Sequence, residues 1–570
     1  MEVGLHGNNL FIILNTHKLI FKNINYKLLV FLLIIIAGAL EFFGLSLLYP
    51  LVSILFEIET QNNQLLDYLN NFLNLININS KFLIILLICL LVIFKAIFLF
   101  LYRYICTINV INFQLFLQKE LFSKYYLTIF SYSENKKSRL INSISEQAKH
   151  AQSAMQIQFN ILENIIILIF LIVLSYFISL QILILSIVLS FFIMLIFKFT
   201  ISLANKYSLN LISANELFYK LINKSLTNFK YIKVTNTNEK FFNEFKPIIG
   251  NIKINTLKFV LLNRGSKIMI EPIVLILVSI IFFISIKYLA IDISLVLIMY
   301  LIIARVFQKF LALINLMQQY SKDNASVSYC FKFLDELNNN REKGGNIIFK
   351  KFNSITLKDI SFSYGSNQIL KNLNLDIKKN KITTIYGKSG IGKTTLSNLL
   401  MLLIYEDSGQ ILLNKKKMRD YDYDKLRAKI GYVSQDNSVF NMSLIDNLCL
   451  RNKKTNHKEI IKYLKKFDLN QFLTSDNKIK NIDINQDASN LSNGQKQRIS
   501  IIRELLAKPE ILILDEITSS VDKDSLFKIM DTLKSLKSQT TIFIITHQIE
   551  YRKISDYNYL LENKKLKKII

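Results

Sequence analysis

The run Gly387–Thr394 (GKSGIGKT) has the spacing G-x-x-x-x-G-K-T and directly follows the apolar stretch Lys381–Tyr386. Glycines in such a loop let backbone N–H groups wrap a phosphate, and the loop opens a helix whose positive N-terminus faces the anion. Lys393 is expected to bridge the β- and γ-phosphates of a nucleotide, and the Thr394 hydroxyl to bind Mg²⁺. The predicted phosphate-binding residues are Gly387, Lys388, Ser389, Gly390, Ile391, Gly392, Lys393, Thr394 and Thr395.

Two further apolar stretches end in polar side chains. Ile511–Leu514 runs into Asp515 and Glu516, and Thr541–Thr546 runs into His547. Short, uniformly apolar stretches are typical of parallel strands buried on both faces, whose carboxyl ends meet at the ligand-binding edge of a sheet. There Asp515 is placed to hold Mg²⁺, directly or through water. Glu516 can polarise an attacking water as general base, and His547 can contact the γ-phosphate. The pattern predicts hydrolysis of a nucleoside triphosphate.

The composition indicates more than a soluble enzyme. The chain has 570 residues, of which 51% are hydrophobic, and a net charge of +28. This length predicts at least two domains, and a membrane half joined to a soluble half accounts for the hydrophobic content. A large positive charge fits nucleic acid, anionic lipid or the cytoplasmic loops of a membrane protein, and does not by itself decide among them.

Apolar segments recur up to about residue 316. The clearest, Asn164–Phe197, carries no charged residue. As one helix it would be about 51 Å long, against a hydrocarbon core of about 30 Å, so two spans turning near Ser179–Gln181 fit better. With these two, the sequence predicts six spans, the others being Leu28–Leu55, Phe82–Ile108, Pro272–Lys287 and Ile293–Leu316.

Loop charges predict the orientation of these spans. Residues 198–267 carry twelve lysines and arginines, whereas residues 56–80 carry none. The positive-inside rule therefore places the amino terminus, the long segments 103–149 and 198–267, and everything after the sixth span in the cytoplasm. The two long segments are expected to be helices that extend out of the membrane and turn near Ser131–Arg139 and Thr227–Lys233.

The segment between the first two spans has a helical pattern. Apolar residues of Asn63–Leu75 recur at helical spacing. It is predicted either as an amphipathic helix lying on the outer membrane surface or as an ordinary extracellular helix packed on its neighbours.

The run Leu491–Gln495 (LSNGQ) identifies the family that the chain resembles. It is similar to the LSGGQ signature of ABC ATPases. Neighbouring residues agree: Tyr364 resembles the aromatic residue that stacks on adenine, Gln435 the loop glutamine that senses Mg²⁺ and faces the membrane domain, and Asp522 the dimer-contact aspartate. With six spans and two long inward segments, the whole chain resembles an ABC transporter half-molecule of the exporter type. The resemblance implies an α-helical membrane domain of six transmembrane helices over 1–335, a linker over 336–347, and an α/β P-loop ATPase domain of the ABC type over 348–570.

The resemblance also implies how ATP and Mg²⁺ would be used. Two ATPase domains would pair head to tail, with ATP between Gly387–Thr394 of one and Ser492, Asn493, Gly494 and Gln495 of the other. A homodimer is the simpler expectation, because Glu516 and His547 match the active pattern. A homologous half-transporter as partner stays open, because Asn493 replaces the first signature glycine. In that family the two turns, here near Ser131–Arg139 and Thr227–Lys233, are coupling helices that dock on the ATPase domains. Residues Asn481–Asp487 lack the glycine-rich pattern usual before the signature, so the contacts of this stretch to the coupling helices depart from the family's pattern.

The transported substrate is the least determined prediction. Lys95, Lys267 and Arg305 fall in or beside spans two, five and six, and intramembrane charges are functional candidates by default. Three cations suit an anionic head group such as pyrophosphate; the other interpretation is snorkelling or pairing with Glu41, Glu163 or Glu271.

Two segments resemble a subset of such transporters. Gly38–Phe56 and Leu226–Phe242 are similar to segments of bacterial flippases for lipid-linked oligosaccharides. The expectation is ATP-driven flipping of an amphipathic, anionic, lipid-linked oligosaccharide across the bacterial inner membrane, by a multi-pass protein with its ATPase domain in the cytoplasm and no nucleic-acid partner. The alternatives are export of a peptide or other amphipath and, remotely, a soluble ABC ATPase acting on nucleic acid.

Overall fold

The computed structural model describes most of the chain. It covers residues 25–56, 81–134, 136–178, 217–287, 293–435, 438–452, 454–480, 482–485, 490–517 and 523–569, with scattered positions between 68 and 73 and between 180 and 215. The chain folds as two compact units. One, the helical unit, comprises Met1–Tyr126 and Lys136–Asn339, and the other, the mixed unit, comprises Leu127–Asn135 and Asn340–Ile570.

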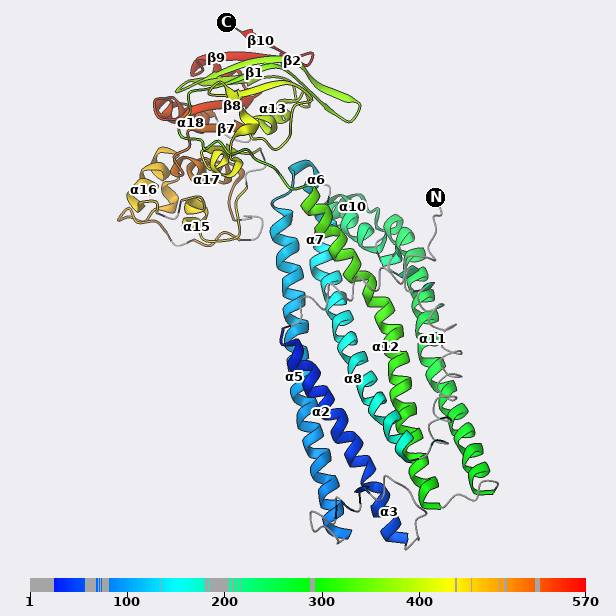
Figure 1. The fold of residues 1–570 in the computed structure, drawn as a ribbon. Coiled ribbons are helices and arrows are strands. Elements are labelled where there is room, and N and C mark those ends of the chain that lie inside the picture. Colours follow the sequence, from blue (N-terminus) through cyan, green and yellow to red (C-terminus); the bar gives the residue numbers. More distant parts are fainter. Residues whose placement is uncertain are drawn as a thin grey trace. The chain divides into compact units, whose positions relative to one another are not determined.

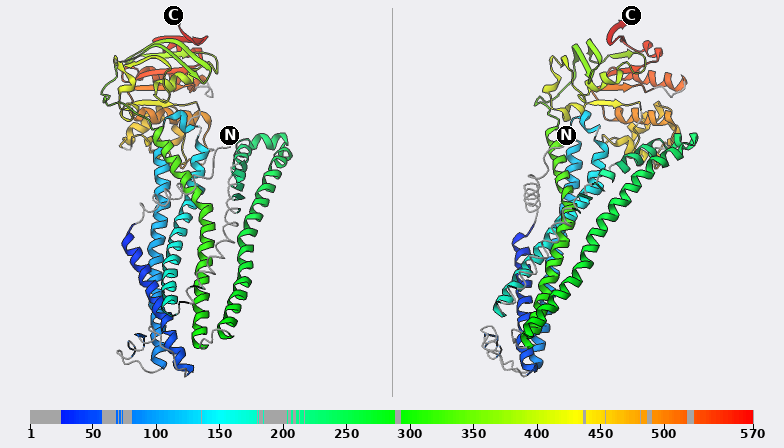
Figure 2. Two further views of the ribbon diagram at one scale, coloured as in Figure 1. Left: turned by 45° about the vertical axis from the view of Figure 1, so that its right-hand side comes forward. Right: turned by 90° about the vertical axis from the view of Figure 1, so that its right-hand side faces the viewer.

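Long apolar helices make up the described part of the helical unit (Figure 1). In both views of Figure 2, α5, α8 and α12 run side by side along much of their length. The helices are α2 (Lys27–Ser46), α3 (Leu48–Phe56), α5 (Lys81–Tyr125), α7 (Lys137–Asn142), α8 (Ala148–Ile178), α10 (Phe229–Thr235), α11 (Asn238–Lys287) and α12 (Ile293–Asn339), with a π-helical stretch at Ser143–Gln147.

Four stretches of the described residues are helices long and apolar enough to cross a membrane: Lys27–Val52, Lys81–Tyr125, Lys137–Ile178 and Tyr300–Asn339. They overlap four of the six predicted spans. A fifth, Pro272–Lys287, is the end of the continuous helix α11. The span predicted after Ser179–Gln181 and most of Asn63–Leu75 lie outside the described residues.

The described residues of the predicted inward extensions are largely helical, and the chain turns near Ser131–Arg139 and Thr227–Lys233 as expected. Helix α5 continues without a break from its apolar part to Tyr125, and the short helix α6 (Phe130–Glu134) follows it. In the second extension, α10 ends at Thr235, and the φ of 54° at Asn236 takes the chain out of the helix before α11 begins. Each turn therefore contains one short helix, α6 in the first extension and α10 in the second.

The mixed unit is built on two sheets. A 6-stranded sheet has the order β10-β9-β3-β8-β7-β6, and a 4-stranded sheet has the order β2-β1-β4-β5. Strands β9, β3, β8, β7 and β6 pair in parallel, and β10 is antiparallel to β9. The strands are β1 (Ser354–Tyr364), β2 (Asn367–Lys378), β3 (Ile382–Tyr386), β4 (Ser408–Leu413), β5 (Lys416–Lys417), β6 (Ile430–Val433), β7 (Ile511–Asp515), β8 (Thr541–Thr546), β9 (Tyr557–Glu562) and β10 (Lys565–Ile569). The helices are α13 (Lys393–Leu400), α14 (Tyr423–Arg427), α15 (Leu444–Cys449), α16 (His457–Lys466), α17 (Asn493–Leu506) and α18 (Lys523–Leu536).

The central strands have a hydrophobic core on each face. Every residue of β3, β7 and β8 is buried. Along β7, Leu512 and Leu514 belong to one cluster, whereas Ile511 and Ile513 belong to the other, as the alternation of side chains along a strand requires. Burial on both faces explains the uniformly apolar sequence of these strands.

Nothing in the sequence marked residues 127–135 as part of the mixed unit. The backbone N–H of Ile129 donates to Asn340 O at 3.0 Å, and that of Glu342 donates to Leu127 O at 2.9 Å, around an antiparallel bridge between Thr128 and Arg341. The segment that contains α6 is therefore hydrogen-bonded to the strand-like start of the mixed unit's main part.

An ion pair between Glu342 and Arg427 ties the 340–342 segment to the rest of the mixed unit. Glu342 accepts two hydrogen bonds of 2.7 Å from the Arg427 guanidinium. The same guanidinium donates to Met401 O at 3.1 Å and to Leu402 O at 2.6 Å. Arg427 ends α14, shortly before β6 begins. The 340–342 segment is thus held to the helix that leads into the parallel sheet.

Replacing Arg427 by methionine would leave the Glu342 carboxylate partly buried without its partner. Because removing one member of a buried pair is strongly destabilising and this pair is partly exposed, the local free energy of opening should fall by about 2 kcal/mol. Hydrogen exchange of full-length protein should then speed up about 30-fold in peptides covering 127–135 and 340–347.

The matched control is Lys508→Gln, which breaks an exposed pair with Glu459 in the same unit. It should leave exchange in both peptides unchanged. Equal protection of the two segments in the Arg427→Met protein and the wild type would show that the pair does not hold them.

Candidate functional site

The phosphate loop lies between β3 and α13. Gly390 and Gly392 have φ values of +77° and +108°, which side-chain-bearing residues rarely adopt. A Cβ on Gly392 would lie 2.6 Å from Ile369 Cγ2. The tip, Lys388–Gly390, is exposed, and Lys393 begins α13 behind it. All the predicted phosphate-binding residues, from Gly387 to Thr395, therefore lie in one loop and the first turn of one helix.

Lys393 is buried in this loop, with 4% of its surface exposed. Its Nζ donates to Gly387 O at 2.8 Å and to Lys388 O at 3.1 Å, and lies 2.7 Å from Glu516 Oε1. The ammonium is thus held by a carboxylate and two carbonyls at the place where phosphate oxygens are expected. A nucleotide phosphate would compete with these oxygens for the same three donors.

Asp515 ends β7 beside α13. Ser397 Oγ donates to its Oδ2 at 3.2 Å, while its Oδ1 is buried and accepts no hydrogen bond from the described residues. Burial raises the pKa of this carboxyl, and the nearby Glu516 carboxylate raises it further. A buried carboxylate with an unpartnered oxygen, next to the Thr394 hydroxyl, fits the oxygen ligands that Mg²⁺ prefers. When bound there, Mg²⁺ would neutralise charge on the phosphate oxygens.

Glu516 and His547 follow neighbouring parallel strands, and Asp515 is paired with Ile545 in that register. Glu516 has a φ of +51°, an uncommon conformation for a non-glycine residue. Its N–H donates to Ile545 O at 2.8 Å, which fixes the residue just past the strand end. His547 directly follows β8 and is exposed. The predicted base and the predicted γ-phosphate contact therefore share one sheet edge with the phosphate loop.

Tyr364 and Gln435 are also exposed. Tyr364 ends β1, and its ring stands edge-on to Phe362 at 4.8 Å. About half of the Tyr364 surface is exposed, so part of its ring is accessible to a base. Gln435 follows β6, the strand next to β7, so it comes from the same edge as Asp515. It stays a predicted Mg²⁺-sensing residue.

The signature-like residues form the start of α17. Ser492 caps the helix: its hydroxyl accepts from the Gln495 N–H at 3.2 Å, and its own N–H donates to Gln495 Oε1 at 2.8 Å. Such a capping box fixes a helix end whose remaining N–H groups favour an anion. Asn493 is exposed at the first helical position, so its side chain stands at this end. Asp522 lies outside the described residues.

The three candidate substrate-contacting cations belong to the helical unit. Lys95 on α5 pairs with Glu41 on α2, at 3.2 Å, and Glu41 is buried. Pairing with Glu41 was one of the two interpretations of Lys95, and the structure shows that pair. Arg305 is exposed on α12, and the side chain of Lys267 lies outside the described residues.

Sequence reasoning missed two groups of residues near the site. Ser397 lies three residues after Thr394, a helical spacing that could have placed its hydroxyl beside Asp515. Glu504 on the signature helix pairs with Arg451, which also donates to Ala428 O at 3.0 Å. The Tyr432 N–H donates to Glu504 at 3.4 Å, so α17 is tied to the strand leading to Gln435. No local pattern could reveal that Arg451 and Tyr432 bind Glu504, because these residues are distant in sequence.

Replacing Glu516 by glutamine should separate binding from hydrolysis. Loss of a general base lowers turnover by about 10²- to 10⁴-fold. Nucleotide binding should not weaken, because the substitution removes the carboxylate that holds Lys393 at 2.7 Å. The measurement is phosphate release and nucleotide binding by the full-length protein in lipid nanodiscs.

Asp515→Asn is the matched control, since it alters the neighbouring carboxylate. It should make binding less dependent on Mg²⁺ and should not mimic the Glu516 variant. A Glu516→Gln protein that still hydrolyses ATP at near the wild-type rate would rule out the assigned base.

Comparisons with known proteins agree with this geometry. The family model for the ABC transporter transmembrane region matches residues 27–310, and the model for ABC transporter matches residues 370–519. Among solved structures, the chain is similar to a bacterial Atm1-family ABC exporter with ATP bound, with a TM-score of 0.77 and 17% identity over 94% of this chain and 93% of the other. At that identity the likeness shows the fold.

Curated relatives match part of the chain. The ATP-dependent lipid A-core flippase of Francisella tularensis is 32% identical over 210 residues, 37% of this chain and 34% of the relative. The alpha-hemolysin translocation ATP-binding protein HlyB of Escherichia coli is 35% identical over 214 residues, 37% of this chain and 30% of the relative. The matches thus span about a third of these relatives' length. With both family models in one polypeptide and this fold, the chain belongs to the ABC transporter family and combines an exporter-type transmembrane domain with an ABC ATPase domain.

Proposed function

We propose that this protein uses ATP hydrolysis to move an amphipathic substrate outward across the bacterial inner membrane, and that the substrate is a lipid-linked oligosaccharide. The observation that carries the ATPase part is the shared sheet edge. There Lys393 of the phosphate loop lies 2.7 Å from the candidate base Glu516, beside the buried carboxylate of Asp515. The groups proposed for phosphate binding, for Mg²⁺ binding and for activation of water are thus close enough to act on one nucleotide.

ATP would be held by residues from two ATPase domains. The phosphate loop and Tyr364 supply one wall, and the capped start of α17 is the anion-favouring helix end expected from the other domain. Asn493 stands where a glycine is usual, but the Ser492 hydroxyl and the Gly494 backbone are retained. We therefore infer a homodimer with two working sites, and a homologous half-transporter is the alternative partner.

The helical unit supports movement of a lipid. Its long apolar helices contain buried charges that are paired within the unit, Glu41 with Lys95 and Glu163 with Arg103. Intramembrane charges of this kind mark substrate or ion pathways. One similar protein is named an ATP-dependent lipid A-core flippase, and this name supports a lipid substrate. A second is named for translocation of alpha-hemolysin, so export of a peptide or protein is the second candidate.

Substrate stimulation tests this proposal. In proteoliposomes, a polyprenyl pyrophosphate carrying a glycan should raise ATP turnover severalfold and should be moved between leaflets only when ATP is present. The physical reason is that substrate binding in the membrane domain favours the closed, hydrolysing arrangement of the ATPase domains. The Glu516→Gln protein in the same vesicles is the control for uncatalysed lipid movement.

The competing function makes the opposite prediction. If amphipathic peptides stimulate turnover and the glycolipid does not, the oligosaccharide proposal is wrong and peptide export is favoured.

A further inference from the structure

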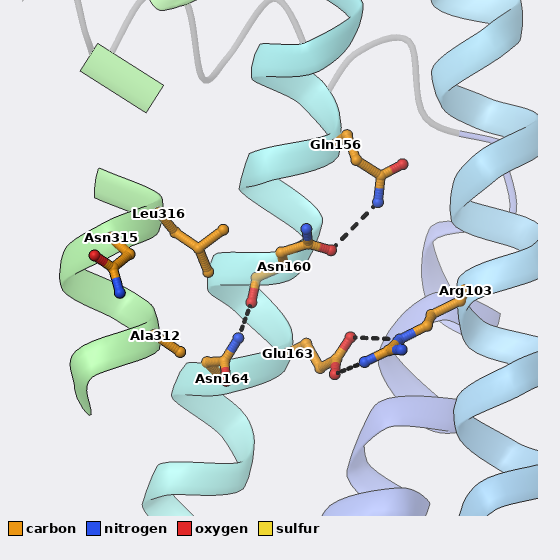
Figure 3. Close-up of a pocket in the computed structure, with 8 residues that line it drawn as sticks. All are labelled: Arg103, Gln156, Asn160, Glu163, Asn164, Ala312, Asn315 and Leu316. Atoms are coloured by element: carbon orange, nitrogen blue, oxygen red, sulfur yellow. Dashed lines mark hydrogen bonds and ion pairs between the residues drawn. The ribbon is translucent and has the colours of Figure 1, made fainter. Parts of the chain in front are cut away.

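The helical unit contains a polar pocket between α5, α8 and α12, with a volume of about 520 Å³. Figure 3 shows the side chains of these helices that line it. The size is in the range of small-molecule binding sites in proteins. Its polar lining consists of Arg103, Gln156, Asn160, Glu163, Asn164 and Asn315.

The charged residues of the lining neutralise each other. Arg103 donates to Glu163 through Nη2 at 2.8 Å and through Nε at 3.3 Å. Glu163 is 4% exposed, so its negative charge is compensated by Arg103 and is not available to a ligand. The lining therefore offers hydrogen bonds and no uncompensated charge, which disfavours a phosphate as its direct occupant.

The amides are arranged along two helices. On α8, Gln156 donates to Asn160 Oδ1 at 3.3 Å, and Asn164 donates to Asn160 O at 2.8 Å. On α12, Asn315 Oδ1 is buried and accepts no hydrogen bond from the described residues. Because this oxygen is enclosed, Asn315 contributes to the pocket lining through the rest of its side chain.

The pocket lies where the uncharged stretches of its helices end. On α5, Phe82–Leu101 contains one charged residue, Lys95, before Arg103 is reached. On α8, the uncharged run begins at Asn164, directly after the pocket residue Glu163. With the predicted orientation, this is the level of the inner leaflet's head groups, where polar parts of a lipid reside.

We propose that this pocket binds the sugar next to the pyrophosphate of a lipid-linked glycan, with the amides of Asn160 and Asn315 contacting its hydroxyl or acetamido groups. This inference rests on the proposed function and concerns how the substrate is recognised. The sugar binds in the pocket, and the lipid pyrophosphate lies outside it. Leu316, which also lines the pocket, offers an apolar surface for the ring face.

Asn315→Leu is the diagnostic variant. Because it removes a buried acceptor that has no partner, folding should be unchanged or more stable. The concentration of a polyprenyl pyrophosphate carrying one N-acetylhexosamine needed for half-maximal ATPase stimulation should rise about tenfold, since two or fewer hydrogen bonds are lost. The response to bare polyprenyl pyrophosphate should not change. Asn251→Leu, at an exposed position of α11, is the matched control and should change neither response.

A direct binding measurement separates this proposal from the proposed function. The chain has no tryptophan. Leu316→Trp therefore places a single fluorescent reporter in the pocket of the full-length protein. The glycan-bearing lipid should shift its emission, bare polyprenyl pyrophosphate should not, and adding Asn315→Leu should weaken the shift about tenfold.

Each outcome decides one proposal. A sugar-dependent shift without any ATPase stimulation would overturn the proposed function and keep the sugar site. Stimulation without a shift, or an Asn315→Leu effect that is equal for both lipids, would overturn the sugar site and keep the proposed function. Silence in both measurements would reject both.

Discussion

The parallel register of four neighbouring strands is the constraint on which the nucleotide site depends. Strands β3, β8, β7 and β6 lie side by side and point the same way. Their carboxyl ends therefore deliver the phosphate loop, His547, Asp515 with Glu516, and Gln435 to one edge, although these residues are spread over much of the mixed unit's sequence. The strands are buried on both faces, so a shift of register would disturb two hydrophobic cores at once. The two hydrophobic cores thus fix the positions of the nucleotide-site residues.

The residues at that edge could be predicted because their spacing is local. The G-x-x-x-x-G-K-T run, the strand before Asp515 and the capped start at Ser492 each fit within about ten residues, and their physical roles follow from one loop, one strand or one helix end. The Lys393–Glu516 pair could not be predicted in the same way, because it needs the register of two strands that are distant in sequence. The same reason hid the Arg427–Glu342 pair and the pocket between α5, α8 and α12. Apolar length predicted spans well, but it could not say that Lys95 is paired with Glu41.

The helical unit handles charge differently from the mixed unit. At the nucleotide edge, the Lys393 ammonium lies 2.7 Å from the Glu516 carboxylate, and Asp515, which precedes Glu516 in the chain, is buried. In the helical unit, Glu41 and Glu163 are buried and each lies against a cation on α5. Such pairs are tolerated among apolar helices because each charge has its partner at contact distance. Among the described residues that line the pocket, the remaining side chains are neutral amides and apolar groups, Gln156, Asn160, Asn164, Asn315, Ala312 and Leu316.

The bridge between Thr128 and Arg341 has a consequence for how the protein is made. Residues 127–135 leave the ribosome well before the 340–342 segment to which they bond, and helices α7 to α12 are synthesised in between. The mixed unit therefore cannot complete its structure from residues 340–570 alone as they emerge. It also has to bind residues 127–135, which were synthesised earlier. Closing so long a loop costs entropy that only the finished contacts repay. Insertion of the helices in the correct topology thus becomes a precondition for completing the ATPase unit, which couples membrane insertion to maturation of the catalytic half within one chain.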